Sequence, residues 1–151
     1  MIAFIKESAV SFKICKVISM KGYVNVIEKA TMKNTDFRRV LYTGKHSQLV
    51  LMSLRPGEEI GEETHSDVDQ FFRFEAGEGR VIIDGAEHRV TDGDAVIVPA
   101  GARHNVVNAS KRSALKLYTI YSPPEHQDKV VRHTKSEAMA SEEHFDGRTT
   151  E

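Results

Sequence analysis

The chain contains very little cysteine and no long apolar segment. Its 151 residues include one cysteine, Cys15, which cannot form an intrachain disulfide and cannot by itself provide a sulfur-rich metal site. We interpret Cys15 as a small apolar residue. No apolar run approaches the roughly 20 residues needed to span a bilayer, and charged residues interrupt the N-terminal region, which therefore makes a poor signal peptide. We expect a cytoplasmic protein without a membrane partner.

An excess of either charge is also absent. The chain has 21 lysine and arginine residues against 22 aspartate and glutamate residues, for a net charge of -1. The basic residues are scattered among acidic ones, so the sequence lacks the positive stripe of a nucleic-acid-binding surface. The content of 40% hydrophobic and 28% charged residues is ordinary for one soluble domain. The composition therefore argues against a nucleic-acid partner.

Short strand patterns are what the sequence has in quantity. Asp84-Gly85 is the strongest hairpin signal, and Pro123-Pro124 ends the strand-rich region. There are about ten such runs and no alternation of strands with helices, which predicts an all-β fold, either an antiparallel barrel or a double-sheet jelly roll. The main predicted strands cover residues 23–27, 37–43, 48–54, 69–75, 80–83, 88–90, 95–98, 104–108 and 114–121.

The chain divides into three expected parts by composition. Met20 is an alternative start of translation, and Thr134 is predicted to cap a short C-terminal helical turn with Glu137 as its capping partner. Beyond Ser141 the chain is polar, and we expect a frayed end. The three parts are an N-terminal extension (1–19), a barrel (20–125) and a C-terminal tail (126–151).

Several side chains that can bind a metal share faces of the predicted strands. Glu63 and His65 point the same way because side chains alternate along a strand. Gln70 and His104 lie on strands whose same-face neighbours are apolar. A buried unpaired carboxylate costs several kcal/mol, and a divalent cation removes that cost by supplying the opposite charge. The pattern predicts a metal site built from Glu63, His65, Gln70 and His104.

The same alternation predicts the residues around this site. No arginine is identified as facing inward, and the histidines of the tail, His126 and His133, are expected to be solvated. A lid over the barrel mouth is the alternative role for these two histidines. The residues expected to line a substrate pocket are Gln48, Phe72, Phe74 and Tyr118.

At these residues the chain resembles the cupin superfamily. The second cupin motif is matched at every position, by Gly93, Pro99, Gly101, His104 and Asn108. The first motif is matched only in part. Gly57 and Gly77 stand at its ends and His65 takes its second histidine, but Glu63 replaces the first histidine and Gln70 replaces the glutamate. The resemblance covers about residues 20–125 and is strongest to small single-domain bacterial cupins labelled mannose-6-phosphate-isomerase-like.

The resemblance implies a double-stranded β-helix that binds a divalent metal, whose identity (zinc, manganese, iron or nickel) stays open. It implies a metal-dependent enzyme, isomerase-like or dioxygenase-like, that acts on a small polar metabolite such as a sugar or sugar acid. Glu63 is the candidate catalytic residue, since it can alternate between metal ligand and base. The alternative is a non-catalytic metal- or ligand-binding module. The resemblance also implies a homodimer.

Overall fold

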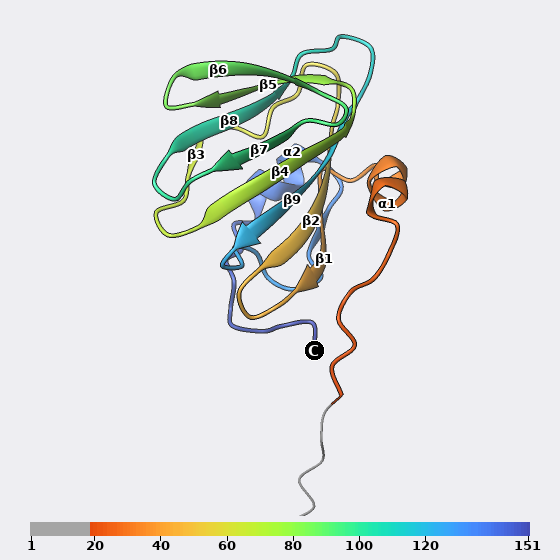
Figure 1. Cartoon of the computed structure of the whole chain (residues 1–151), viewed down its shortest axis with the longest axis vertical. Coiled ribbons are helices and arrows are strands. Elements are labelled where there is room, and N and C mark those ends of the chain that lie inside the picture. Colours follow the sequence, from red (N-terminus) through yellow and green to blue (C-terminus); the bar gives the residue numbers. More distant parts are fainter. Residues whose placement is uncertain (1–18) are drawn as a thin grey trace, which may run out of the picture.

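The computed structural model describes residues 19–151 as two antiparallel sheets packed face to face (Figure 1). The larger sheet has six strands in the order β10-β1-β2-β9-β4-β7, and the smaller has four in the order β3-β8-β5-β6. The all-β double-sheet prediction is therefore confirmed. The predictions for Cys15 and for residues 1–18 of the extension lie outside the described residues.

The strands of the larger sheet are β1 (Arg38–Thr43), β2 (Gln48–Leu54), β4 (Asp69–Ala76), β7 (Ala95–Val98), β9 (Leu115–Ser122) and β10 (Val131–Arg132). Those of the smaller sheet are β3 (Glu63–Thr64), β5 (Glu78–Ile83), β6 (Ala86–Thr91) and β8 (Arg103–Asn108). The two helices are α1 (Ile27–Lys33) and α2 (Lys135–Ala140).

The core lies between the inner faces of the two sheets. In β4 and β9 every second residue is buried, as expected when one sheet face packs and the other does not. Asp84 and Gly85, at φ 46° and 86°, join β5 to β6, which confirms the predicted tight hairpin. The largest fully buried apolar side chains are those of Val50, Met52, Leu54, Phe72, Phe74, Val81, Val98, Leu115, Leu117 and Tyr121.

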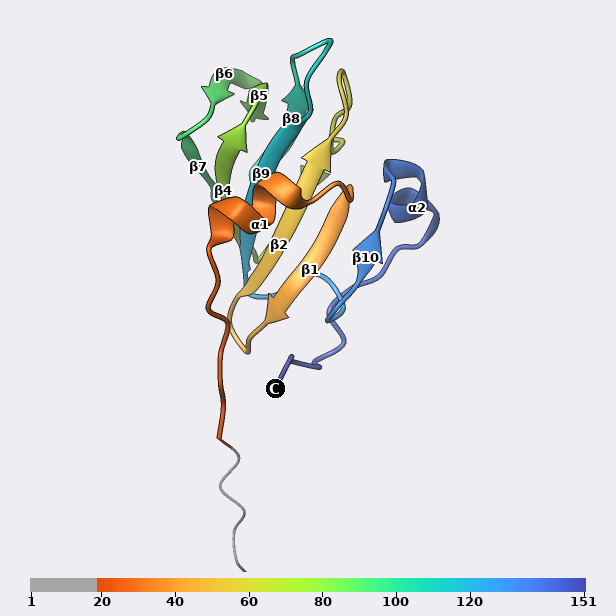
Figure 2. The ribbon, with the colours of Figure 1, turned by 90° about the vertical axis from the view of Figure 1, so that its right-hand side faces the viewer.

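Helix α1 corrects the prediction of a strand at 23–27. The alternation there covers only five residues, and the next residues, Ile27–Lys33, form a helix that contacts β4 and β9 (Figure 2). Glu28 in its first turn and Lys33 in its last complement the helix dipole. The buried Thr31 anchors its inner side. Local helix propensity and packing on the sheet outweigh a short alternating pattern.

The C-terminal tail lies against the barrel and corrects the expectation of a frayed end. Strand β10 pairs with β1, Thr134 accepts a hydrogen bond from the Glu137 amide at 3.2 Å, and α2 follows as predicted (Figure 2). Farther on, the Thr150 amide donates to the Thr43 carbonyl at 2.9 Å. The tail therefore adds a strand to the larger sheet and a wall beside it.

Within residues 19–151, no helix is long and apolar enough to cross a membrane.

Candidate metal centre and its cavity

Strand pairing brings together three of the predicted metal ligands. Glu63 in β3 and His104 in β8 are direct partners across the strands, and His65 follows β3 immediately. One donor atom from each of the three residues lies within 4.8 Å of the other two. Two donors that share an ion at about 2.1 Å are at most about 4.2 Å apart. The three side chains therefore lie near the spacing that one shared ion requires.

Gln70 completes the group through its contact with His104. The Nε2 atom of His104 lies 3.0 Å from Oε1 of Gln70, while its Nδ1 atom lies 3.1 Å from the carbonyl oxygen of Ala102. A neutral imidazole carries one proton, so it can donate to only one of these acceptors. When Nδ1 donates to Ala102, the Nε2 lone pair faces the Gln70 oxygen. A cation between them removes this conflict, because two donors about 2.1 Å from one ion at right angles are about 3.0 Å apart.

Glu63 and His65 form the half of the group that is closer to solvent. Burial favours the neutral form of Glu63, but the adjacent His65, together with Arg38 and His104, outweighs burial and holds the pKa of Glu63 below its usual range. The Glu63 carboxylate in turn raises the pKa of His65 against the opposing effect of burial. The His65 Nε2 atom is buried, 3.5 Å from Glu63, without a hydrogen-bond partner in the described chain. A carboxylate, two imidazoles and an amide oxygen with one such orphaned nitrogen fit a divalent ion.

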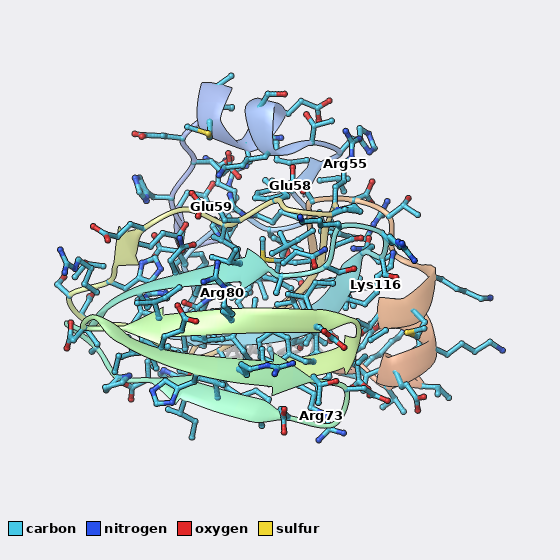
Figure 3. The ribbon with its side chains drawn as sticks, turned by 90° about the horizontal axis from the view of Figure 1, so that it is seen from above. Arg55, Glu58, Glu59, Arg73, Arg80 and Lys116 are labelled. Atoms are coloured by element: carbon cyan, nitrogen blue, oxygen red, sulfur yellow. The ribbon has the colours of Figure 1, made fainter. Side chains whose placement is uncertain are left out.

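A cavity of about 630 Å³ opens onto this half of the group. Glu63 and His65 line it, whereas His104 and Gln70 are buried behind them. Its walls come from the segment between β2 and β3, from the start of β1 and from the tail. In Figure 3 the segment that carries Glu58 and Glu59 runs between the C-terminal helix on one side and the smaller sheet on the other. The cavity therefore lies between the barrel and the tail.

Comparison with known proteins identifies the family. A family model for the cupin domain matches residues 50–121. The uncharacterized protein YrkC of Bacillus subtilis (strain 168) is 46% identical over 129 residues, which cover 82% of this chain and 69% of YrkC. The chain belongs to the cupin family.

Two further relatives of this cupin extend the comparison. The uncharacterized protein L612 of Acanthamoeba polyphaga mimivirus is 44% identical over 108 residues, which cover 69% of this chain and 67% of L612. The crystal structure of BH2720 from Bacillus halodurans superposes with a TM-score of 0.78 at 44% identity, over 80% of this chain and 96% of that one. The names of these relatives give no activity.

The residues predicted to line the substrate pocket do not line the cavity of this cupin, and these predictions are corrected. Phe72 and Phe74 lie on the inner face of β4 but are fully buried in the core. Tyr118 alternates with the buried positions of β9 and contacts Phe71 on the opposite face of the larger sheet. Gln48 is also fully buried, and its amide bonds to backbone atoms of His126.

Three cavity residues were missed by the sequence interpretation. Arg38 is buried in β1, on the same strand face as the buried Val40. The alternation of side chains along this strand could therefore have identified Arg38 as inward-facing. His126 was expected in solvent but is only 6% exposed. Glu125, whose carboxylate lies 3.7 Å from Nδ1 of His65, gave no signal because it follows two prolines outside any strand. His133 keeps its predicted exposure, with 69% of its side chain accessible.

Proposed function

We propose that this cupin is a metal-dependent enzyme that acts on a small polar metabolite such as a sugar or sugar acid. One observation carries the proposal: the donor atoms of three side chains lie within 4.8 Å of one another, and two of these side chains line an open cavity. The proposed ligands are Glu63, His65 and His104, with the Gln70 oxygen as a fourth donor. Zinc, manganese, iron and nickel all suit this combination of carboxylate and imidazole.

The residues of the site suit isomerase-like proton transfer. When bound, a divalent ion acts as a Lewis acid toward a carbonyl or hydroxyl oxygen. Glu63 lines the cavity and carries a carboxylate that favours its ionised form, so it can accept a proton from a carbon beside that oxygen and return it to the neighbouring carbon. His104 and Gln70 lie behind it and hold the geometry. Dioxygenase-like chemistry would use the same open face.

The cavity supports an enzyme more than the alternative, a non-catalytic binding module. Catalysis requires a coordination position that substrate can reach. Both Glu63 and His65 border the cavity, and only the other two proposed ligands are enclosed. A purely structural or sensing site would be expected to be closed on all sides.

The first test is elemental analysis of untagged protein, before any substrate screen. We expect a stoichiometric divalent metal in the wild type, and its loss in His65→Ala and in His104→Ala because each variant removes a donor. His88→Ala is the matched control, since His88 is exposed on β6. Stoichiometric metal retained in both ligand variants would contradict the assignment.

We also propose that the protein is a cytoplasmic homodimer. Its single cysteine supports a reducing compartment. Val24 and Val26 are exposed apolar side chains just before α1, 95% and 63% accessible, and they support pairing through the N-terminal part of the chain. Light scattering should return the mass of two chains, and a monomer mass would remove this proposal.

A further inference from the structure

Arg38 presents unused hydrogen-bond donors to the cavity. The residue is 9% exposed and lines the cavity. Its nearest acidic partner is Glu143 of the tail, with Nη1 3.7 Å from Oε1, which is longer than a hydrogen bond. Its buried Nε atom has no hydrogen-bond partner among residues 19–151. A guanidinium has five N–H donors in a planar fork that matches a carboxylate, so Arg38 can still bind an anionic group.

His126 is a second residue of the cavity lining with buried, unpaired polar atoms. It is 6% exposed, and neither ring nitrogen has a hydrogen-bond partner in the part of the chain that the structure describes. The ring is held in place by edge-to-face packing on Tyr121, with centroids 5.0 Å apart. The backbone of His126 is held by the Gln48 amide, which donates to its carbonyl at 2.7 Å and accepts from its N–H at 2.9 Å.

The imidazole of His126 is neutral at neutral pH. Burial lowers its pKa well below the usual range, and the charge of Arg38 acts in the same direction, against a weaker opposing effect of the Glu143 backbone. A neutral imidazole has one N–H donor and one acceptor nitrogen. A hydroxyl group can pair with either ring nitrogen, because it can donate to the acceptor nitrogen or accept from the N–H.

We propose that this cavity binds a small hydroxy acid, with its carboxylate on the guanidinium of Arg38 and a hydroxyl group on the imidazole of His126. The inference deepens the proposed function and rests on it in one respect, the presence of a metal at Glu63 and His65 beside the bound acid. A volume of about 630 Å³ is within the range of small-molecule sites.

The charges around Arg38 favour a carboxylate over a phosphate. Glu143 already places a carboxylate near Arg38, and its other oxygen accepts from Arg132 at 2.8 Å. The cavity lining includes six glutamates against two permanently cationic side chains, Arg38 and Lys135. A singly charged carboxylate adds less repulsion to this lining than a phosphate dianion does.

The test uses calorimetric titration of the metal-loaded, full-length protein with glycolate, acetate, ethylene glycol and inorganic phosphate. We expect glycolate to bind more tightly than the other three. Arg38→Met should weaken glycolate binding by about tenfold or more, as expected when a charged hydrogen bond is lost. Arg112→Met is the matched control, because Arg112 is exposed and does not line the cavity. It should change the affinity by less than about twofold, well below the loss of a charged hydrogen bond.

Two further variants keep the proposal testable if Arg38→Met does not fold. Arg38→Lys retains the charge without the planar fork and should give a partial loss of glycolate affinity. His126→Phe retains the aromatic packing on Tyr121 and should abolish the preference for glycolate over acetate. A circular dichroism spectrum matching that of the wild type identifies which variants are folded.

Several results would overturn the site. These are equal glycolate affinity in the folded Arg38 variants and in Arg112→Met, an unchanged glycolate preference in His126→Phe, and Arg38-dependent phosphate binding tighter than that of glycolate. The metal content of each sample separates this failure from that of the proposed function. Arg38-dependent glycolate binding by protein that takes up no metal would refute the proposed metal enzyme and leave the acid site in place. Metal-loaded protein without such binding would refute the acid site alone.

Discussion

Asn108 shows how a residue of the metal-binding motif can have a purely structural task. It is 2% exposed, and its amide nitrogen lies within 3.0 Å of the carbonyl oxygens of Leu54, Arg55 and Ser113. Its side-chain oxygen accepts from the Ser110 amide at 2.9 Å. The side chain therefore ties the end of β8 to the end of β2 and to the loop before β9, at the opposite end of β8 from His104.

Replacing this amide should lower stability without affecting metal binding. Asn108→Ala leaves buried carbonyl groups without a donor, which costs about 1–3 kcal/mol for each group left unsatisfied. We expect a lower free energy of unfolding in urea and an unchanged metal content. Gln127→Ala, at an exposed position, should change neither. If Asn108→Ala were as stable as the wild type, the three hydrogen bonds from the Asn108 amide nitrogen would contribute nothing to the stability of the fold.

At the scale of elements, the junction of α1, β1 and β10 depends on Asp36. Its carboxylate accepts from Arg39 Nε at 2.7 Å and lies 2.6 Å from Nδ1 of His133, just after β10. Burial favours the neutral carboxyl, but the hydrogen bonds from His133 and Arg39 outweigh it and lower the pKa of Asp36. Asp36 is thus bonded both to the start of β1 and to the tail.

The lowered pKa predicts a pH-dependent contribution to stability. A carboxyl whose pKa is lower in the folded state stabilises the fold above its unfolded value, here about 3.9, and loses that contribution as the pH falls through the folded value. Asp36→Asn should therefore cost about 1 kcal/mol at pH 7, since Arg39 and His133 are partly exposed. The difference from wild type should shrink below pH 4. Urea unfolding at both pH values measures it, and a constant difference would contradict the assignment.

The elements that the sequence predicts well are those whose local pattern agrees with their packing. The strands around Phe72 and His104 alternate clearly, and the Asp84-Gly85 turn accommodates positive φ. Helix α1 was missed because a short alternation preceded it. Arg38 was missed although its strand phase points inward, and His126 was missed because it follows the barrel, where no strand alternation predicts burial. The proposed metal donors were predictable from strand phase, whereas the cavity required the whole molecule.

At the scale of the whole molecule, the protein combines a barrel with a tail that pairs with the edge strand β1 through β10. All four proposed metal ligands belong to the barrel, but one wall of the cavity belongs to the tail. Beside the backbone pairing of β10 with β1, the side chain of Glu143, only 5% exposed, faces Arg38 of the barrel and Arg132 of β10. The two parts should therefore respond differently when this carboxylate is removed.

Glu143→Gln should loosen the tail and leave the metal centre in place. The substitution removes the counter-charge of two largely buried guanidinium groups, a loss that costs about 3–5 kcal/mol when a buried pair is broken. In hydrogen exchange, we expect faster exchange of the amides of β10 and α2 with unchanged protection of β4 and β9, and metal content equal to that of the wild type. Glu142→Gln alters the neighbouring but exposed carboxylate and should leave the exchange pattern unchanged. If β4 and β9 lost protection together with β10, the barrel and the tail would have to unfold as one unit, and the cavity wall would be an integral part of the metal-binding barrel.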